Sequence, residues 1–111
     1  MNGSQASGSR EDMKILLGML ETLLDDLKSI PQQGAGYYSP DSFIDRYNRL
    51  LPVAEDLFGG SRLMRTFSPI ETRKSVDPSD KMKMNQKVII ETGQLISLVK
   101  SYLDRAPEPG E

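Results

Sequence analysis

The chain has 111 residues and a net charge of −2, with 37% hydrophobic and 27% charged residues. These values are typical of a single globular domain, and no apolar run approaches the roughly 18–20 residues that a bilayer span needs. Cysteine, histidine and tryptophan are absent, which excludes disulfides, thiolate or imidazole metal ligands, and acid–base catalysis by histidine. We therefore expect a protein that is not an enzyme and holds no cofactor and no metal.

The two ends of the chain are polar. The opening MNGSQASGSR has no hydrophobic stretch of the kind found in signal peptides. We interpret residues 1–8 as a flexible leader, either native or a remnant of cloning, and expect one domain over residues 9–105 and a flexible tail over residues 106–111. Because nothing directs secretion, we expect a cytoplasmic protein.

A first helix is expected over residues 9–30. Ser9 and Asp12 have the spacing of a capping pair at a helix start. Hydrophobic residues then recur at spacings of 3 and 4, which places them in one stripe on a helix face: Met13, Leu16, Leu20, Leu23, Leu27 and Ile30. Three further residues widen this apolar face on its two sides: Leu17 and Leu24 on one, Met19 on the other.

The loop PQQGAGYY follows the first helix and ends with Tyr37 and Tyr38. Adjacent tyrosines in a loop suit the centre of a protein interface. They also suit a lid that closes the end of a small bundle, so both interpretations stay open.

A second helix is expected from Ser39-Pro40-Asp41, with Ser39 as its cap and Pro40 at its first position. Its expected stripe is Phe43, Tyr47, Leu50, Ala54 and Leu57, with Ile44, Leu51 and Phe58 beside it. The apolar pattern stays in phase on both sides of Pro52. We therefore expect a helix that is kinked or locally broken there, as a bend around the core or as a hinge, and that continues to a cap at Gly59.

Two more helical segments follow. Ser61 can cap a short turn with Leu63, Met64 and Phe67, and Asp77-Pro78 predicts the start of a last helix that ends near Asp104. In that helix the expected stripe recurs every seven residues with Val99 between, and a second set flanks it: Met82, Ile89, Ile96 and Leu103, then Val88, Leu95 and Tyr102. Asn85 and Thr92 weaken its early half.

The predicted fold is an all-α, antiparallel three-helix bundle with a short extra helix between the second and third long helices. A four-helix arrangement formed by dimerisation is the alternative. It arises because the apolar face of the first helix is wide for two partner helices to cover.

Two groups of residues resemble binding sites but are better explained as ordinary surface. Glu21 and Asp25 share a helix face, and Glu55 and Asp56 are adjacent, but no calcium-binding or Glu-x-x-His spacing accompanies them. GAGYY and GGSR lack the lysine and spacing of a phosphate-binding loop. We interpret the acids as a solvated face and the glycines as turns.

A basic segment extends from Arg62 to Lys87, with seven basic against three acidic residues. The basic residues are Arg62, Arg65, Arg73, Lys74, Lys81, Lys83 and Lys87. Such a segment can contact acidic protein surfaces or phosphates, or serve only as solvated surface. Phe67 is its one aromatic residue, whereas nucleic-acid recognition needs stacking platforms or a helix that enters a groove.

Residues 43–67 resemble a helical accessory module found beside effector domains, TIR-like or nucleotide-binding, in prokaryotic defence and signalling proteins. The resemblance depends on Phe43, Tyr47, Asn48, Arg49, Leu57, Phe58, Gly59, Ser61, Leu63 and Phe67. Pro52 departs from the pattern. The resemblance implies an adaptor or interaction module without catalysis of its own.

The sequence as a whole predicts a helical protein-interaction domain, with an adaptor or regulatory role, that binds another protein or itself and no membrane. The expected contacts are the seven basic residues listed above, together with Tyr37 and Tyr38. The alternative is a small regulatory protein that binds nucleic acid through residues 62–87.

Overall fold

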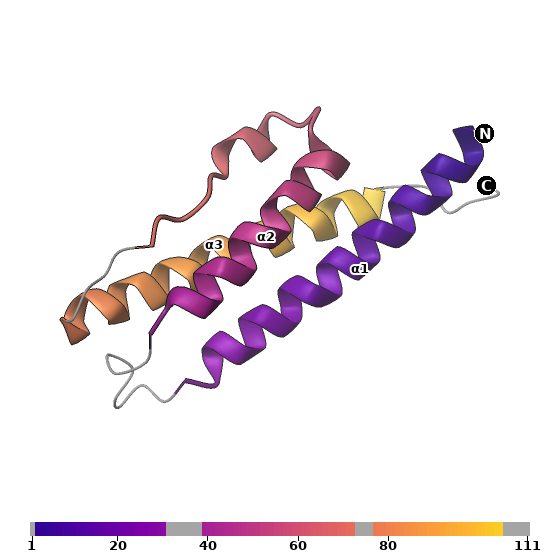
Figure 1. The fold of residues 1–111 in the computed structure, drawn as a ribbon. Coiled ribbons are helices and arrows are strands. Elements are labelled where there is room, and N and C mark those ends of the chain that lie inside the picture. Colours follow the sequence, from indigo (N-terminus) through magenta and orange to yellow (C-terminus); the bar gives the residue numbers. More distant parts are fainter. Residues whose placement is uncertain (1, 31–38, 73–76, 106–111) are drawn as a thin grey trace.

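The computed structural model describes residues 2–30, 39–72 and 77–105. It contains three long helices, α1 (Asn2–Lys28), α2 (Asp41–Phe58) and α3 (Pro78–Arg105), and a short 3-10 helix, η2 (Leu63–Thr66). The expected three-helix bundle with a short helix between the second and third long helices is confirmed. Figure 1 shows α1 running antiparallel to both α2 and α3, while α2 and α3 run in the same direction.

Helix α1 supplies four buried leucines to the core, Leu16, Leu20, Leu23 and Leu27, which confirms the predicted stripe. The helix begins at Asn2, so the predicted start at Ser9 is wrong. Residues 2–8 contain no proline, and a helix that packing has already nucleated extends at little cost. It ends at Lys28 rather than Ile30 because the residue before a proline disfavours helical backbone. The domain limits, residues 9–105, stay a prediction, and residues 106–111 lie outside the described residues.

Helix α2 runs without a break through Pro52 to Phe58. The prediction that the helix continues past the proline is therefore confirmed, and a local break at Pro52 is wrong. Pro52 is exposed, so its ring projects into solvent. Its position costs the helix one backbone hydrogen bond, because proline has no N–H. The bend that such a ring imposes is compatible with a helix that wraps a core.

We predict that Pro52→Ala leaves the free energy of unfolding unchanged or raises it by about 1 kcal/mol, because alanine restores a backbone hydrogen bond in a helix interior. Urea denaturation of the two proteins measures this difference. A clear loss of stability in the alanine variant would show that the proline itself is needed by the fold.

The core stripe of α2 consists of Ile44, Tyr47, Leu51, Ala54 and Phe58. The residues expected at its centre, Phe43, Leu50 and Leu57, are only half-buried. Tyr47 and Ala54 are buried as predicted. The other three core positions each lie one residue later than predicted, because both sets are apolar with the same spacing.

The ends of α2 have local explanations. The Ser39 hydroxyl accepts a hydrogen bond from the Asp41 backbone N–H, at 3.3 Å between N and Oγ, and Pro40 is the cap residue rather than the first helical residue. Gly59 follows Phe58 in a right-handed conformation. A Cβ atom at Gly59 would lie 2.7 Å from the Glu55 backbone oxygen, so the helix end requires glycine for space and not for a left-handed backbone.

Helix α3 begins as predicted, since the Asp77 carboxylate accepts a hydrogen bond from the Ser79 N–H at 2.9 Å. Its buried residues are Asn85, Val88, Thr92, Leu95, Ile96, Leu98 and Val99. Of the expected stripe, Ile96 and Val99 are buried as predicted, whereas Met82 is 40% exposed and Ile89 and Leu103 are half-buried. Two central positions are polar, Asn85 and Thr92, which is why the hydrophobic pattern indicated the wrong centre.

The connection between α2 and α3 covers the seam between these two helices. The Ser61 hydroxyl accepts a hydrogen bond from the Leu63 N–H, but the cap residue of η2 is Arg62. After η2 the chain returns along α2 (Figure 1). Asn48 holds it there through two hydrogen bonds of 2.9 Å, donating to the Ile70 carbonyl and accepting from the Ile70 N–H. Met64 and Ile70 are buried in the core. This return places the start of α3 beside the start of α2 and makes the two helices parallel.

Candidate protein-interaction surfaces

The structure separates the basic residues that the sequence groups together. Arg62 and Arg65 are exposed at η2, beside the C-terminal end of α2, whereas Lys81, Lys83 and Lys87 lie on the first turns of α3, at the opposite end of the bundle (Figure 1). Tyr37, Tyr38, Arg73 and Lys74 lie outside the described residues. The part of the basic segment that the structure describes thus forms two separate groups rather than one patch.

Lys83 and Lys87 border a surface hollow of about 510 Å³ between α3 and the returning chain. The hollow is lined by Pro69, Ile70, Glu71, Asp80, Lys83, Met84 and Lys87. Two carboxylates and two ammonium groups balance in charge. A phosphate backbone is attracted by an excess of positive charge, so this hollow is a poor nucleic-acid site.

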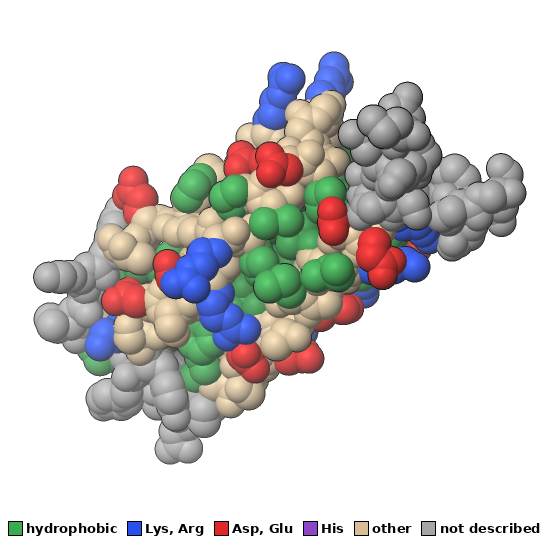
Figure 2. Space-filling model, turned by 45° about the vertical axis from the view of Figure 1, so that its right-hand side comes forward, with side chains coloured by type: hydrophobic (Ala, Val, Ile, Leu, Met, Phe, Trp, Pro, Cys, Tyr) green, Lys and Arg blue, Asp and Glu red, His purple; other side chains and the backbone are tan. Residues whose placement is uncertain are grey.

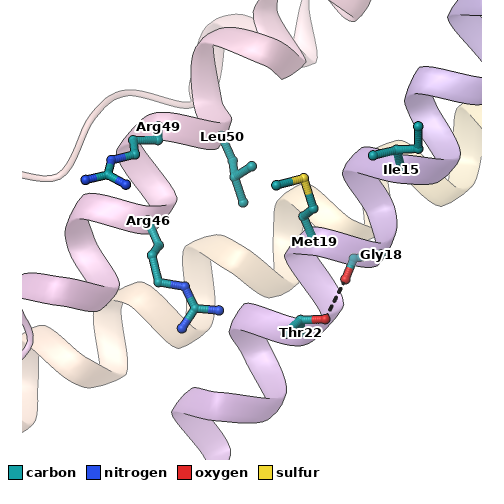
Figure 3. Close-up of a pocket in the computed structure, with 7 residues that line it drawn as sticks. All are labelled: Ile15, Gly18, Met19, Thr22, Arg46, Arg49 and Leu50. Carbon is teal, nitrogen blue, oxygen red and sulfur yellow. Dashed lines mark hydrogen bonds between the residues drawn. The ribbon is translucent and has the colours of Figure 1, made fainter.

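A second hollow, of about 540 Å³, lies between α1 and α2. It is lined by Ile15, Gly18, Met19 and Thr22 of α1 and by Arg46, Arg49 and Leu50 of α2. In Figure 3, Met19 and Leu50 point toward one another across it, and Arg46 reaches toward α1. We call these seven residues, with Val53 one turn further along α2, the α1–α2 face.

Three large hydrophobic side chains are exposed together on the α1–α2 face. Ile15 is 56% exposed, Met19 52% and Val53 43%. Figure 2 shows hydrophobic side chains gathered over α1 and α2, with basic and acidic side chains around them. Single exposed hydrophobic residues are ordinary in proteins, but a contiguous group with a polar rim marks an interaction surface.

Two ion pairs lie at one end of this face. The Arg46 guanidinium contacts the Asp26 carboxylate of α1 at 2.9 Å, and Arg49 contacts Asp45 of its own helix at 2.6 Å. The Arg49 side chain is 75% exposed. Exposed ion pairs contribute little to stability, about 0–1 kcal/mol, so these arginines can exchange or share their carboxylates when a partner binds.

The sequence predictions did not identify this face, because each helix was interpreted by its strongest stripe. Ile15, Met19 and Val53 all lie off those stripes. The available signal was the unusual width of the apolar face of the first helix, which Met19 extends on one side. That signal indicated a partner for the first helix but not its location, since the neighbouring α2 residues are far away in sequence.

Two buried hydroxyl groups lie in the core rather than at a surface site. Tyr47 and Thr92 are fully buried, and no described group makes a hydrogen bond with either hydroxyl. Burial raises the pKa of Tyr47 above its usual range, and the nearby Glu91 carboxylate raises that pKa further. A phenol with a raised pKa stays protonated, so Tyr47 supports packing and offers no reactive phenolate.

We predict that Tyr47→Phe leaves the free energy of unfolding at neutral pH unchanged or raises it by about 1 kcal/mol, because the variant buries no unpaired hydroxyl. Because the pKa of Tyr47 is raised in the folded state, the folded protein keeps this phenol protonated when the unfolded chain ionises it. This titration leaves the free energy of unfolding unchanged below the unfolded-state pKa of about 10 and lowers it as pH rises above that value. Urea denaturation above about pH 10 is therefore expected to show a smaller loss of stability for the variant. Equal losses would contradict the buried environment of this phenol.

No protein-family model, curated protein or solved structure matches the chain. The resemblance to prokaryotic accessory modules accordingly stays a prediction. Within the described ranges, no group of three or more acidic side chains is placed to hold a metal ion. None of the described helices is long and apolar enough to cross a membrane.

Proposed function

We propose that this chain is a non-enzymatic helical protein-interaction domain, with an adaptor or regulatory role, and that its α1–α2 face is the docking surface. The observation that carries the proposal is the 540 Å³ groove bordered by exposed Ile15 and Met19. Covering a large hydrophobic side chain completely contributes about 1.5–3 kcal/mol. Several such side chains on one face supply the apolar centre that a protein interface needs.

The shape of the groove supports a helical partner. Two antiparallel helices with a shallow apolar groove between them accept the apolar face of a third helix, whose side chains enter at helical spacing. Arg46 and Arg49 at the rim can hold carboxylates of that partner in charge-assisted hydrogen bonds. The contact residues therefore differ from the basic residues that the sequence favoured.

Binding of nucleic acid through residues 62–87 is the rival function. It has less support, because the described basic residues lie in two groups and Lys83 and Lys87 share their hollow with Glu71 and Asp80. Such binding would fall steeply with salt concentration, since each phosphate contact releases a counterion.

A photo-reactive amino acid placed at position 19 tests the proposal in cells, with position 90 as its matched control. Met19 is 52% exposed on the α1–α2 face, and Ile90 is 56% exposed on α3. We expect protein adducts from position 19 and few from position 90. Equal yields from the two positions would contradict a specific docking face, and adducts that nuclease removes would favour the nucleic-acid function.

A further inference from the structure

We infer that Met19 is a site of reversible oxidation that prevents docking on the α1–α2 face. Oxidation of its thioether to the sulfoxide puts a polar S=O group into the apolar centre of the groove, and reduction restores the face. This inference rests on the proposed function, since it names a way in which the same docking surface is regulated. Its evidence is the exposure of Met19, its position opposite Leu50 and the absence of cysteine from the chain.

Exposure distinguishes Met19 from most of the other methionines that the structure describes. Met19 is 52% exposed and Met64 only 3%, while Met13 and Met84 are partly buried against the core. A dissolved oxidant reaches an exposed thioether more readily than a buried one. Met82 is 40% exposed on α3 and does not line the groove, so it is the matched control for oxidation away from the face.

The reaction transfers one oxygen atom from hydrogen peroxide to sulfur. A lone pair of the Met19 Sδ atom attacks one peroxide oxygen, the O–O bond breaks and an S–O bond forms. Sulfur is oxidised by two electrons, and the other peroxide oxygen leaves as water with both hydrogens. The chain contains no cysteine, so no thiol of its own competes for the peroxide. Methionine therefore provides all of the sulfur that peroxide can oxidise in this chain.

The surroundings of Met19 make the sulfoxide unfavourable once a partner covers the groove. Met19 and Leu50 point toward one another in Figure 3, and Ile15 lines the same hollow one helical turn before Met19. Neither neighbouring side chain can donate a hydrogen bond. A sulfoxide oxygen at position 19 would lose its water without replacement, and an unpaired polar group in an apolar contact weakens binding.

The donors that line the same hollow already have acceptors. The Thr22 hydroxyl donates to the Gly18 carbonyl at 3.0 Å, and the Arg46 guanidinium contacts the Asp26 carboxylate at 2.9 Å. Arg49 is paired with a carboxylate of its own helix. A charged carboxylate is a stronger acceptor for arginine than a neutral sulfoxide. These donors therefore offer a sulfoxide at position 19 little compensation.

Oxidation at position 19 is expected to leave the bundle folded. Met19 lies outside the buried stripe of α1, and its side chain already contacts water. A sulfoxide at the buried Met64 would instead place a polar group in the core. Loss of docking through Met19 is therefore separable from loss of folding.

Peptide mass spectrometry after mild treatment of the full chain with hydrogen peroxide tests the site. We expect Met19 and Met82 to gain one oxygen before Met64 does, while circular dichroism shows unchanged helicity. Oxidation of Met64 as fast as that of Met19 would overturn the inference, and so would loss of helicity once Met19 alone is oxidised.

A photo-reactive amino acid at position 15 tests the effect on docking, because Ile15 is exposed on the same face. The probe is a desalted extract of the source cells. We expect the yield of protein adducts to fall at least about fivefold after mild oxidation. The yield should return after treatment with methionine sulfoxide reductases for both sulfoxide epimers and a dithiol, which removes the oxygen as water.

Two variants assign the effect to one sulfur atom. In Met82→Leu, peroxide should lower the adduct yield as it does in the wild type. Met19→Leu is compared with itself before and after peroxide, and its yield should not change on treatment. A fall in Met19→Leu as large as in the wild type would overturn the inference.

The same experiment distinguishes this inference from the proposed function. A wild-type yield that is unchanged although mass spectrometry shows the Met19 sulfoxide would overturn the inference and leave the docking surface standing. A chain that gives no protein adducts before oxidation would overturn both.

Discussion

Replacement of Leu23 by aspartate is expected to unfold the domain. Leu23 is 0% exposed and lies in the middle of the α1 core stripe. Removing a buried leucine costs about 2–5 kcal/mol, and leaving an unpaired carboxyl group in the core costs several kcal/mol more. Together these terms match the whole stability of an ordinary domain of this size, about 5–15 kcal/mol.

Far-ultraviolet circular dichroism and a thermal melt measure this effect. The matched control is Ile90→Asp, which makes the same kind of change at a side chain that is 56% exposed. We expect the control to keep its helicity and its melting temperature. A Leu23→Asp protein with unchanged helicity and melting would show that α1 buries a different face.

The second large effect is expected for Asn48→Ala, which we predict lowers the free energy of unfolding by about 2–3 kcal/mol. The Asn48 side chain makes both of its hydrogen bonds to the backbone of Ile70, at 2.9 Å each. Alanine leaves the Ile70 N–H and carbonyl unpaired in a part-buried position. It also releases the chain that covers the α2–α3 seam, so Ile70 loses part of its burial.

Urea denaturation gives the size of this effect, and amide hydrogen exchange at Ile70 gives its location. We expect the Ile70 amide to lose protection in Asn48→Ala. The control is Asp45→Ala, an exposed position on the same helix, where a change of no more than about 0.5 kcal/mol is expected. An alanine variant at position 48 with full stability and a protected Ile70 amide would contradict the role of this contact.

The starts of the helices were predictable because their signals are local. Ser39, Ser61 and Asp77 were each predicted as caps, and each side-chain oxygen accepts a backbone N–H two residues further along. The cap positions of α2 and η2 are nevertheless one residue later, at Pro40 and Arg62. The four buried leucines of α1 were predictable for a similar reason, since their spacing alone defines one face. The early start of α1 was not, because residues 2–8 carry no hydrophobic pattern.

The phase of α2 and α3 was not predictable from their own patterns. Phe43, Leu50 and Leu57 compete with Ile44, Leu51 and Phe58 at the same spacing. Which set faces the core depends on where the other helices lie, and neither set of residues specifies this by itself. The parallel direction of α3 depends likewise on the contact between Asn48 and Ile70, which are distant in sequence.

The proposed interaction surface was the least predictable feature, because it joins residues from two helices. The run of basic residues is continuous in sequence, but its described members are divided between the two ends of the bundle (Figure 1). The residues of the α1–α2 face, in contrast, are separated in sequence and adjacent in the structure. Met19 and Leu50 come together only when the two helices pack.

The central claim is that the α1–α2 face is a docking surface, and the reactivity of a single thiol tests it most directly. The chain contains no cysteine, so Met19→Cys and Ile90→Cys each carry one thiol, at positions of similar exposure. We predict that extract of the source cells slows alkylation at position 19 and leaves alkylation at position 90 unchanged. Rates at the two positions that respond equally to the extract would contradict the claim.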